Sequence, residues 1–245
     1  GGAAQGLRLS VDYYRTRVKD YICTAPAGAQ QIVDRCYAGV QIACNLITFG
    51  PGQSITQIRN VSLNLDRLLA EGVDIEAQYR LSLGTDSALI LRGLATHVRK
   101  LEATNFGQAI NRAGQTGQQA AIAAPDWIVN GYVTYDGPLV TATVQGRYIP
   151  SGKFDAAYVG PGDPGYATTV PNSINNNNVG ARFYVNLFGS VRLHGDKERG
   201  VELFGSINNL FDRAPPAAPE TQFPTNPTYF DTIGRYFRAG VRFTF

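Results

Sequence analysis

The chain has 245 residues, of which 44% are hydrophobic and only 17% charged, enough for one large domain with fewer charges than an average soluble protein. The net charge is +3 and the basic residues are spread singly, so we expect no nucleic-acid partner. No apolar run reaches the about 18 residues of a membrane-spanning helix, which excludes a helical membrane protein. The sequence has no methionine and opens without a signal-peptide pattern, so we expect a fragment of a longer chain.

Eight segments alternate between apolar and polar residues, which predicts β-strands with one apolar and one polar face. In the last segment, RYFRAGVRFTF, Phe237, Val241 and Phe243 share one face while Arg238 and Arg242 share the other. In chain order, the predicted strands cover residues 7–16, 72–81, 88–98, 127–135, 140–148, 181–193, 201–208 and 235–245.

Short and long connections between these strands alternate without exception. Turn-forming residues supply the short ones, at 84–87, 136–138 and 194–199. Outer-membrane barrels have short periplasmic turns and long extracellular loops, so we predict an all-β chain that forms part of a transmembrane antiparallel β-barrel. The long connections cover roughly residues 21–54, 105–124, 151–177 and 212–230.

Aromatic residues on the apolar face gather at the strand ends, as the two interfaces of a membrane select. An ordinary half-buried sheet with randomly placed aromatic residues is the alternative. The predicted outer girdle is Tyr13, Trp127, Tyr148, Phe183 and Phe237, and the inner girdle is Tyr79, Tyr135 and Phe245.

Charged residues fall on the opposite face, which predicts a wet lumen. An arginine on the lipid face at the bilayer midplane would cost about 2–4 kcal/mol, and the alternation avoids this cost. The candidate lumen-facing residues are Asp74, Glu76, Arg92, Arg147, Arg182, Arg192, Glu202, Arg238 and Arg242.

Three cysteines lie near the start of the chain. Cys36 and Cys44 are close in sequence and favour a disulfide and an oxidising compartment, with two free thiols in a reducing cytosol as the alternative. Cys23 stands alone. Without a nearby histidine or a C-x-x-C pattern, zinc is not expected. The segment AGAQQIVDRCYAG, residues 27–39, could hold a short helix.

The other long loops are polar and rich in glycine and proline. Asp155 and Asp163 could be considered for a cation, but their spacing matches no calcium-loop pattern, so we expect neither a metal nor a cofactor.

The end of the chain, VELFGSINNLFDRAPP followed by YFDTIGRYFRAGVRFTF, resembles the C-terminal end of TonB-dependent receptors. Upstream, SVDYYRTRVKDYI and NVSLNLDRLLAEGVDIEAQYRL resemble two further strands of that family, and AQQIVDRCYAG resembles one of its extracellular loops. The resemblance covers nearly the whole chain. The order of the matching segments makes it specific. In that family a penultimate strand runs into an Asn-Leu-Phe-Asp motif, here Asn209, Leu210, Phe211 and Asp212.

The resemblance implies that residues 1–245 are the last eight strands of a barrel of about 22 strands in the outer membrane of a Gram-negative bacterium. The plug domain and the earlier strands would then be absent. The implied partners are the TonB complex through that plug, the barrel assembly machinery, outer-membrane lipid and an imported ligand of unknown identity. The implied assembly signal at the end of the chain is Tyr236, Phe243 and Phe245.

The resemblance therefore predicts a receptor that takes up a large, scarce ligand, such as a ferric siderophore, a vitamin or an oligosaccharide. A self-contained eight-stranded structural barrel or passive pore is the alternative. We do not expect an enzyme, because no G-x-S-x-G motif occurs, and the two histidines, His97 and His194, are predicted at an outer strand end and in a periplasmic turn.

Overall fold

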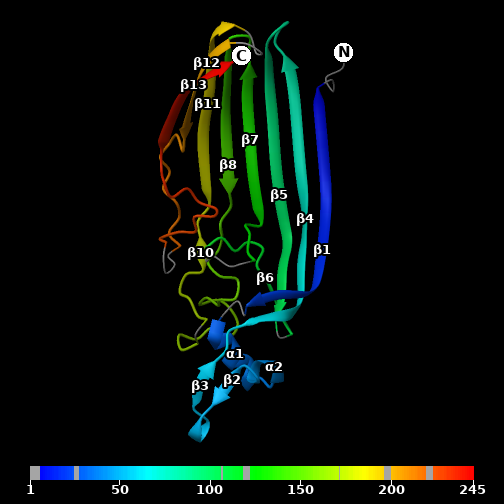
Figure 1. The fold of residues 1–245 in the computed structure, drawn as a ribbon, viewed down its shortest axis with the longest axis vertical. Helices are drawn as coiled ribbons and strands as arrows, with labels where there is room; N and C mark the ends of the chain where they lie inside the picture. The colour runs from blue at the N-terminus through cyan, green and yellow to red at the C-terminus, as the bar shows by residue number, and fades with distance from the viewer. Residues whose placement is uncertain are drawn as a thin grey trace.

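The computed structural model describes residues 6–24, 28–105, 107–117, 122–170, 172–195, 200–218 and 223–245. Eight long strands pair antiparallel in chain order and form one sheet, which confirms the eight predicted strands (Figure 1). They are β1 (Leu7–Thr24), β4 (Ser62–Ser82), β5 (Ala88–Asn105), β7 (Trp127–Asp136), β8 (Val140–Ile149), β11 (Arg182–Gly195), β12 (Gly200–Asn208) and β13 (Tyr236–Thr244).

Short turns join the strands at the upper end in Figure 1, where both chain termini also lie. The backbone N–H of Leu83 donates to Ser87 O at 2.9 Å between β4 and β5, and that of Gly137 donates to Val140 O at 3.0 Å between β7 and β8. The third predicted turn, 194–199, differs in part, because His194 and Gly195 still belong to β11. Its remaining residues, 196–199, lie outside the described part of the chain.

The long connections gather at the opposite end, with secondary structure of their own. The short helix expected within residues 27–39 is present as α1. Among the described residues, no helix is of the length and apolarity that crossing a membrane would take. The elements are α1 (Gly28–Tyr37), α2 (Gln41–Cys44), β2 (Ile47–Phe49), η1 (Pro51–Gln53) and β3 (Ile55–Ile58) after β1, β6 (Gln108–Asn111) paired with β5, and β9 (Gly152–Lys153) paired with β10 (Asn178–Val179).

Three strands, β1, β4 and β5, are longer than predicted, and they take up mainly residues that lay between the predicted strands and the predicted loops. The connections left between the strands, 25–61 and 106–126, are therefore shifted from the expected 21–54 and 105–124 and are not shorter. The pairing of the three strands continues, for example from Arg17 to Leu69 and on to Glu102. Each extended segment supplies the backbone partners of the next, which sustains the ladder without an apolar face. The sequence pattern missed these extensions because charged residues such as Arg17 and Lys19 interrupt the alternation.

The pairing registers keep the apolar rows of neighbouring strands on one face. Many of these side chains are exposed, including Val144 at 45% and Phe237 at 68%. A single-layer sheet with an uncovered apolar face of this extent requires an apolar partner such as lipid. One row that crosses five strands is Val133, Val144, Leu187, Ile207 and Phe237.

Two small buried cores lie toward the loop end of the structure. The first holds the segment between β1 and β4 together, and the second lies where β8 and β11 meet the last long loop. The first core is Ile32, Ala43, Leu46 and Ile47, and the second is Ile149, Val179, Tyr184, Ala218 and Phe230. We call the segment around the first core, residues 28–58, the cap.

A disulfide joins Cys36 of α1 to Cys44 of α2 inside the cap, with the two Cα atoms 4.5 Å apart. This is the pairing that the sequence favoured. The side chain of Cys23 lies outside the described part of the chain. The two cysteines are eight positions apart in the sequence, so the bond closes a short loop beside the first buried core and restrains the cap locally.

Reduction of the Cys36–Cys44 bond should loosen the cap without opening the sheet. A cross-link that closes a loop this short stabilises the folded state by about 2–3 kcal/mol relative to the unfolded chain. In the complete protein, amide hydrogen exchange should therefore accelerate within residues 28–47 on reduction and stay unchanged in β7 and β8. The Cys36→Ala/Cys44→Ala variant is the control, since its exchange should not respond to reductant. Equal protection of the cap before and after reduction would contradict this expectation.

Candidate functional site

The nine charged candidates all lie on the polar face of the sheet, by the pairing registers. Several of them partner one another or a neighbouring strand. Glu76 Oε1 accepts from Arg92 at 2.8 Å, and Asp74 Oδ1 accepts from the Thr96 hydroxyl at 2.7 Å. Cross-strand pairs of opposite charge stabilise a sheet modestly. These groups therefore organise the polar face and are not gathered into one site.

Four more of the arginines contact backbone carbonyls, aromatic rings or Glu202. Arg182 donates through Nε to the carbonyl of Ala214 at 2.8 Å, and Arg192 donates to the carbonyl of Pro138. The guanidinium carbon of Arg238 lies 5.6 Å from the centre of the Tyr236 ring. Arg242 lies 3.6 Å from the carboxylate of Glu202 and 5.5 Å from the Phe204 ring. The ninth candidate, Arg147, faces Asn130 and Tyr184 in the register.

An amide ladder crosses the polar face from β7 to the end of β12, and the sequence analysis missed it. Gln145 donates to the Tyr132 hydroxyl at 3.0 Å and accepts from Asn186 at 3.0 Å. The backbone N–H of Asn209 then donates to Asn186 Oδ1 at 2.8 Å. These residues lie on different strands, so only the register brings them together.

The family motif directly follows β12 and anchors the loop that leads to β13. Asn209 has a left-handed φ of 49° and is 2% exposed. Its side-chain amide donates to Asp231 at 2.8 Å and to the Arg213 carbonyl at 3.1 Å. Asp212 Oδ1 accepts from the Arg235 N–H at 2.9 Å, immediately before β13. The other two motif residues are less enclosed, since Leu210 is half-buried and Phe211 is exposed.

The aromatic residues at the end of the chain lie at the edge strand β13. Tyr236 begins that strand, opposite Asn208. Phe243 pairs with Val201 on the apolar face and is 60% exposed, and Phe245 follows the strand and is fully exposed.

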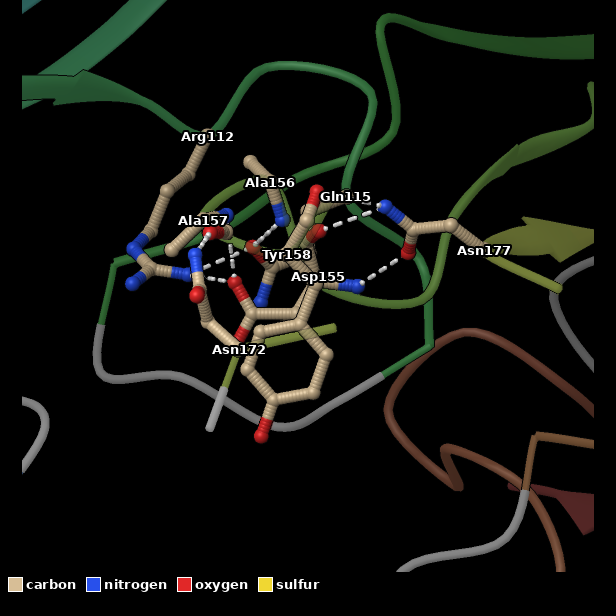
Figure 2. Close-up of polar contacts among 8 residues, drawn as sticks. All are labelled: Arg112, Gln115, Asp155, Ala156, Ala157, Tyr158, Asn172 and Asn177. Carbon is tan, nitrogen blue, oxygen red and sulfur yellow. Dashed lines mark hydrogen bonds and ion pairs between the residues drawn. The ribbon is translucent and has the colours of Figure 1, made fainter. Parts of the chain in front are cut away.

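A buried ion pair joins two of the long loops (Figure 2). Arg112 donates to Asp155 Oδ1 at 2.9 Å, and both side chains are almost fully buried, at 11% and 8% exposed. Arg112 also donates to Gln115 Oε1 at 2.6 Å, and the same oxygen accepts from the Ala156 N–H at 2.9 Å. The loop after β6 and the loop after β8 are thus held as one unit.

A second amide closes this network from the far end of the same loop. Asn177 accepts from the Asp155 N–H at 3.0 Å and donates to the carbonyls of Asp155 and Tyr158 at 3.0 and 3.1 Å (Figure 2). Asn172 donates to the Ala157 carbonyl at 3.0 Å. A segment of more than twenty residues is therefore folded back on itself.

The two aspartates considered for a cation have other roles. Asp155 is paired with Arg112, and Asp163 Oδ2 accepts from the Gly160 N–H at 2.8 Å within its own turn. Within the described ranges, no group of three or more histidine, cysteine, aspartate or glutamate side chains is placed to hold a metal ion.

The last long loop joins the same unit through Tyr229. Its hydroxyl donates to the Ala123 carbonyl at 2.7 Å. Burial raises the pKa of the Tyr229 hydroxyl above its ordinary value, so this donor stays protonated to a higher pH than a free tyrosine would. Three loops that follow β6, β8 and β12 in the sequence are thereby tied together.

Asp155→Asn should release this loop unit, because it leaves the guanidinium of Arg112 buried without a counter-ion. Breaking a buried pair in this way costs about 3–5 kcal/mol. Limited proteolysis and hydrogen exchange of the complete protein should show faster opening at residues 153–158. The matched control is Glu76→Gln, which breaks the half-exposed pair with Arg92 and should cost under about 1 kcal/mol. Equal protection in both variants would refute a structural role for Asp155.

The chain is similar to known receptors in sequence profile and in fold. The profile of the family described as TonB dependent receptor-like, beta-barrel, matches residues 2–210. The FrpB iron transporter from Neisseria meningitidis (F3-3 variant) superposes with a TM-score of 0.54 at 13% identity, over 96% of this chain and 29% of that chain. A mutant of the ferric enterobactin receptor (PfeA) from Pseudomonas aeruginosa superposes with a TM-score of 0.54 at 16% identity, over 97% and 29% of the two chains.

At these identities, the likeness to solved structures concerns the fold, and this chain spans 29% of their length. A search of curated protein sequences finds no match. The family profile, however, extends over most of the chain and agrees with the antiparallel sheet and its alternating short and long connections. This chain therefore belongs to the TonB-dependent receptor β-barrel family.

Proposed function

We propose that this chain forms the C-terminal wall of an outer-membrane receptor that imports a large, scarce ligand with energy supplied by the TonB complex. The family supports this proposal, and the two solved proteins named above are an iron transporter and a ferric enterobactin receptor. A ferric siderophore is therefore the first ligand to test. The energy would reach the barrel through a plug domain, which would belong to the remainder of the protein.

The observation that carries the proposal is the loop unit held by the buried Arg112–Asp155 pair. Loops on a rigid scaffold are the usual place for ligand recognition. A preorganised loop avoids part of the entropy cost of binding. The unit lies at the same end of the sheet as the cap, so the chain offers an organised surface where an extracellular ligand would arrive (Figure 1).

The polar face would line the lumen in this proposal. Its charged pairs and the amide ladder of Tyr132, Gln145 and Asn186 present hydrogen-bonding groups across five strands. A plug domain or a passing ligand could exchange hydrogen bonds with such a surface at little cost, since both states remain hydrated.

A self-contained eight-stranded barrel has less support. In the part of the chain that the structure describes, β1 pairs only with β4 and β13 only with β12. Both edges then expose backbone groups, which a membrane does not tolerate without partners. Further strands of a larger barrel would satisfy both edges.

Uptake by the complete receptor tests the proposal. Cells with this receptor as their only siderophore receptor should accumulate radiolabelled ferric enterobactin, and removal of TonB or an uncoupler should abolish uptake while leaving surface binding intact. Asp155→Asn should weaken binding at least about tenfold, because the loop unit opens, whereas Arg80→Gln, which removes a half-exposed ion pair with Asp136 at the turn end of the sheet, should leave it near wild type. Labelled vitamin B12 and maltodextrin test the other ligand classes. Uptake that continues without TonB would overturn the energised mechanism.

Deletion of Phe245 should lower the amount of receptor in the outer membrane, because we propose that Tyr236, Phe243 and Phe245 form the signal read by the barrel assembly machinery. The matched control is Phe183→Ala, which removes an exposed aromatic ring from the same apolar face. Heat-modifiability of the folded receptor in isolated outer membranes measures assembly. Normal levels of the truncated receptor, or an equal loss in the control, would count against the signal.

A further inference from the structure

A row of aromatic rings marks one end of the apolar face. The rings of His97 and Trp127 stack with centroids 4.4 Å apart, and Tyr13 is 61% exposed on the same face. Such rings settle at the boundary between hydrocarbon and headgroups. The cross-strand row that they define is Tyr13, Val73, His97 and Trp127.

Beyond this row, only β1, β4 and β5 continue as strands, toward the loop end (Figure 1). By the pairing registers, their side chains on the apolar-face side are now mostly charged, and the bulge at Glu71 and Gly72 adds Arg99. Six are basic and two are acidic, so this surface carries a net charge of 6 − 2 = +4. We call it the basic band: Arg15, Arg17, Lys19, Arg67, Arg99 and Lys100, with Glu71 and Glu102.

Glu71 organises the centre of the basic band. Its side chain is only 5% exposed and contacts Arg99 Nη1 at 2.7 Å and Arg15 Nε at 3.5 Å. Those two arginine side chains remain 66% and 54% exposed. One buried carboxylate thus holds two guanidinium groups, and both arginine side chains stay more than half exposed. Arg67 is held similarly by Glu102 at 2.7 Å.

We propose that the basic band binds the phosphate groups of outer-leaflet lipid headgroups. Arg15 follows Tyr13 by two residues, so it lies about 7 Å beyond the aromatic row, where headgroups begin. Paired guanidinium groups match phosphate oxygens in geometry and charge. The surface continues directly from the apolar face, so a lipid whose chains lie against Tyr13 and Val73 would bring its headgroup to these residues. The inference rests on the proposed membrane orientation, but its test does not involve transport.

Lipid binding to the purified complete receptor tests the proposal. Native mass spectrometry would compare diphosphorylated lipid A, the same lipid without phosphates, and phosphatidylcholine. We expect the phosphorylated lipid to be retained preferentially. Each basic residue near a membrane surface contributes about fivefold in affinity, so Arg17→Gln/Lys19→Gln should weaken binding about 25-fold. The control is Arg8→Gln, which removes one positive charge from the other face of β1. This variant should bind the phosphorylated lipid as wild type does.

Glu71→Gln separates an organised site from a diffuse positive surface. This variant makes the net charge of the basic band more positive by one, so a diffuse positive surface would bind the phosphorylated lipid more tightly. A site that depends on Glu71 should instead bind that lipid at least about fivefold more weakly. Three outcomes would overturn the proposal. They are equal retention of the dephosphorylated lipid, an equal loss of lipid binding in Arg8→Gln, and tighter lipid binding by Glu71→Gln. Inorganic phosphate that displaces the lipid at comparable concentration would also overturn it, because the site would then recognise the free anion. Normal lipid selectivity with failed ferric enterobactin uptake would count only against the proposed transport.

Discussion

The antiparallel backbone ladder, with a register that preserves parity from strand to strand, is the constraint on which the rest of this structure depends. A slip of one residue between two strands would move every side chain of one strand to the wrong face. The register shifts at Glu71/Gly72 and Arg192/His194 lie near the ends of the apolar face, so the rows between them stay uniform. A bulge at Val144 would instead bring polar neighbours to the apolar face.

This ladder also explains why the sheet contains almost no core of its own. Both faces of a single layer are open, and the two buried apolar clusters lie in the cap, around Ile32, and at the loop end of β8 and β11, around Ile149. Packing therefore stabilises the loop end, while hydrogen bonds and the surrounding lipid stabilise the strands. Charged pairs such as Glu76–Arg92 remain half-exposed and contribute little stability by themselves.

The proposed functions depend on the loops and the strand extensions at one end of the sheet. The Arg112–Asp155 pair and the Tyr229–Ala123 contact hold three loops together, and the disulfide restrains the cap beside them. The extension of β1, β4 and β5 past the aromatic row creates the basic band at headgroup level. One end of the sheet thus combines a preorganised loop surface with a charged lateral surface, and the two can act independently.

The sequence by itself determined the strands, the two faces and the alternation of turns and loops, because a period of two and turn-forming residues are local properties of the chain. It also indicated the cysteine pair and the motif at Asn209. Tertiary structure decided the rest. The Arg112–Asp155 pair joins residues 43 apart, and the Asn186–Gln145 contact joins residues 41 apart, so no local pattern reports either. The extra length of β1, β4 and β5 arises in the same way, since paired neighbours supply the hydrogen bonds that sustain a strand whose own alternation has ended.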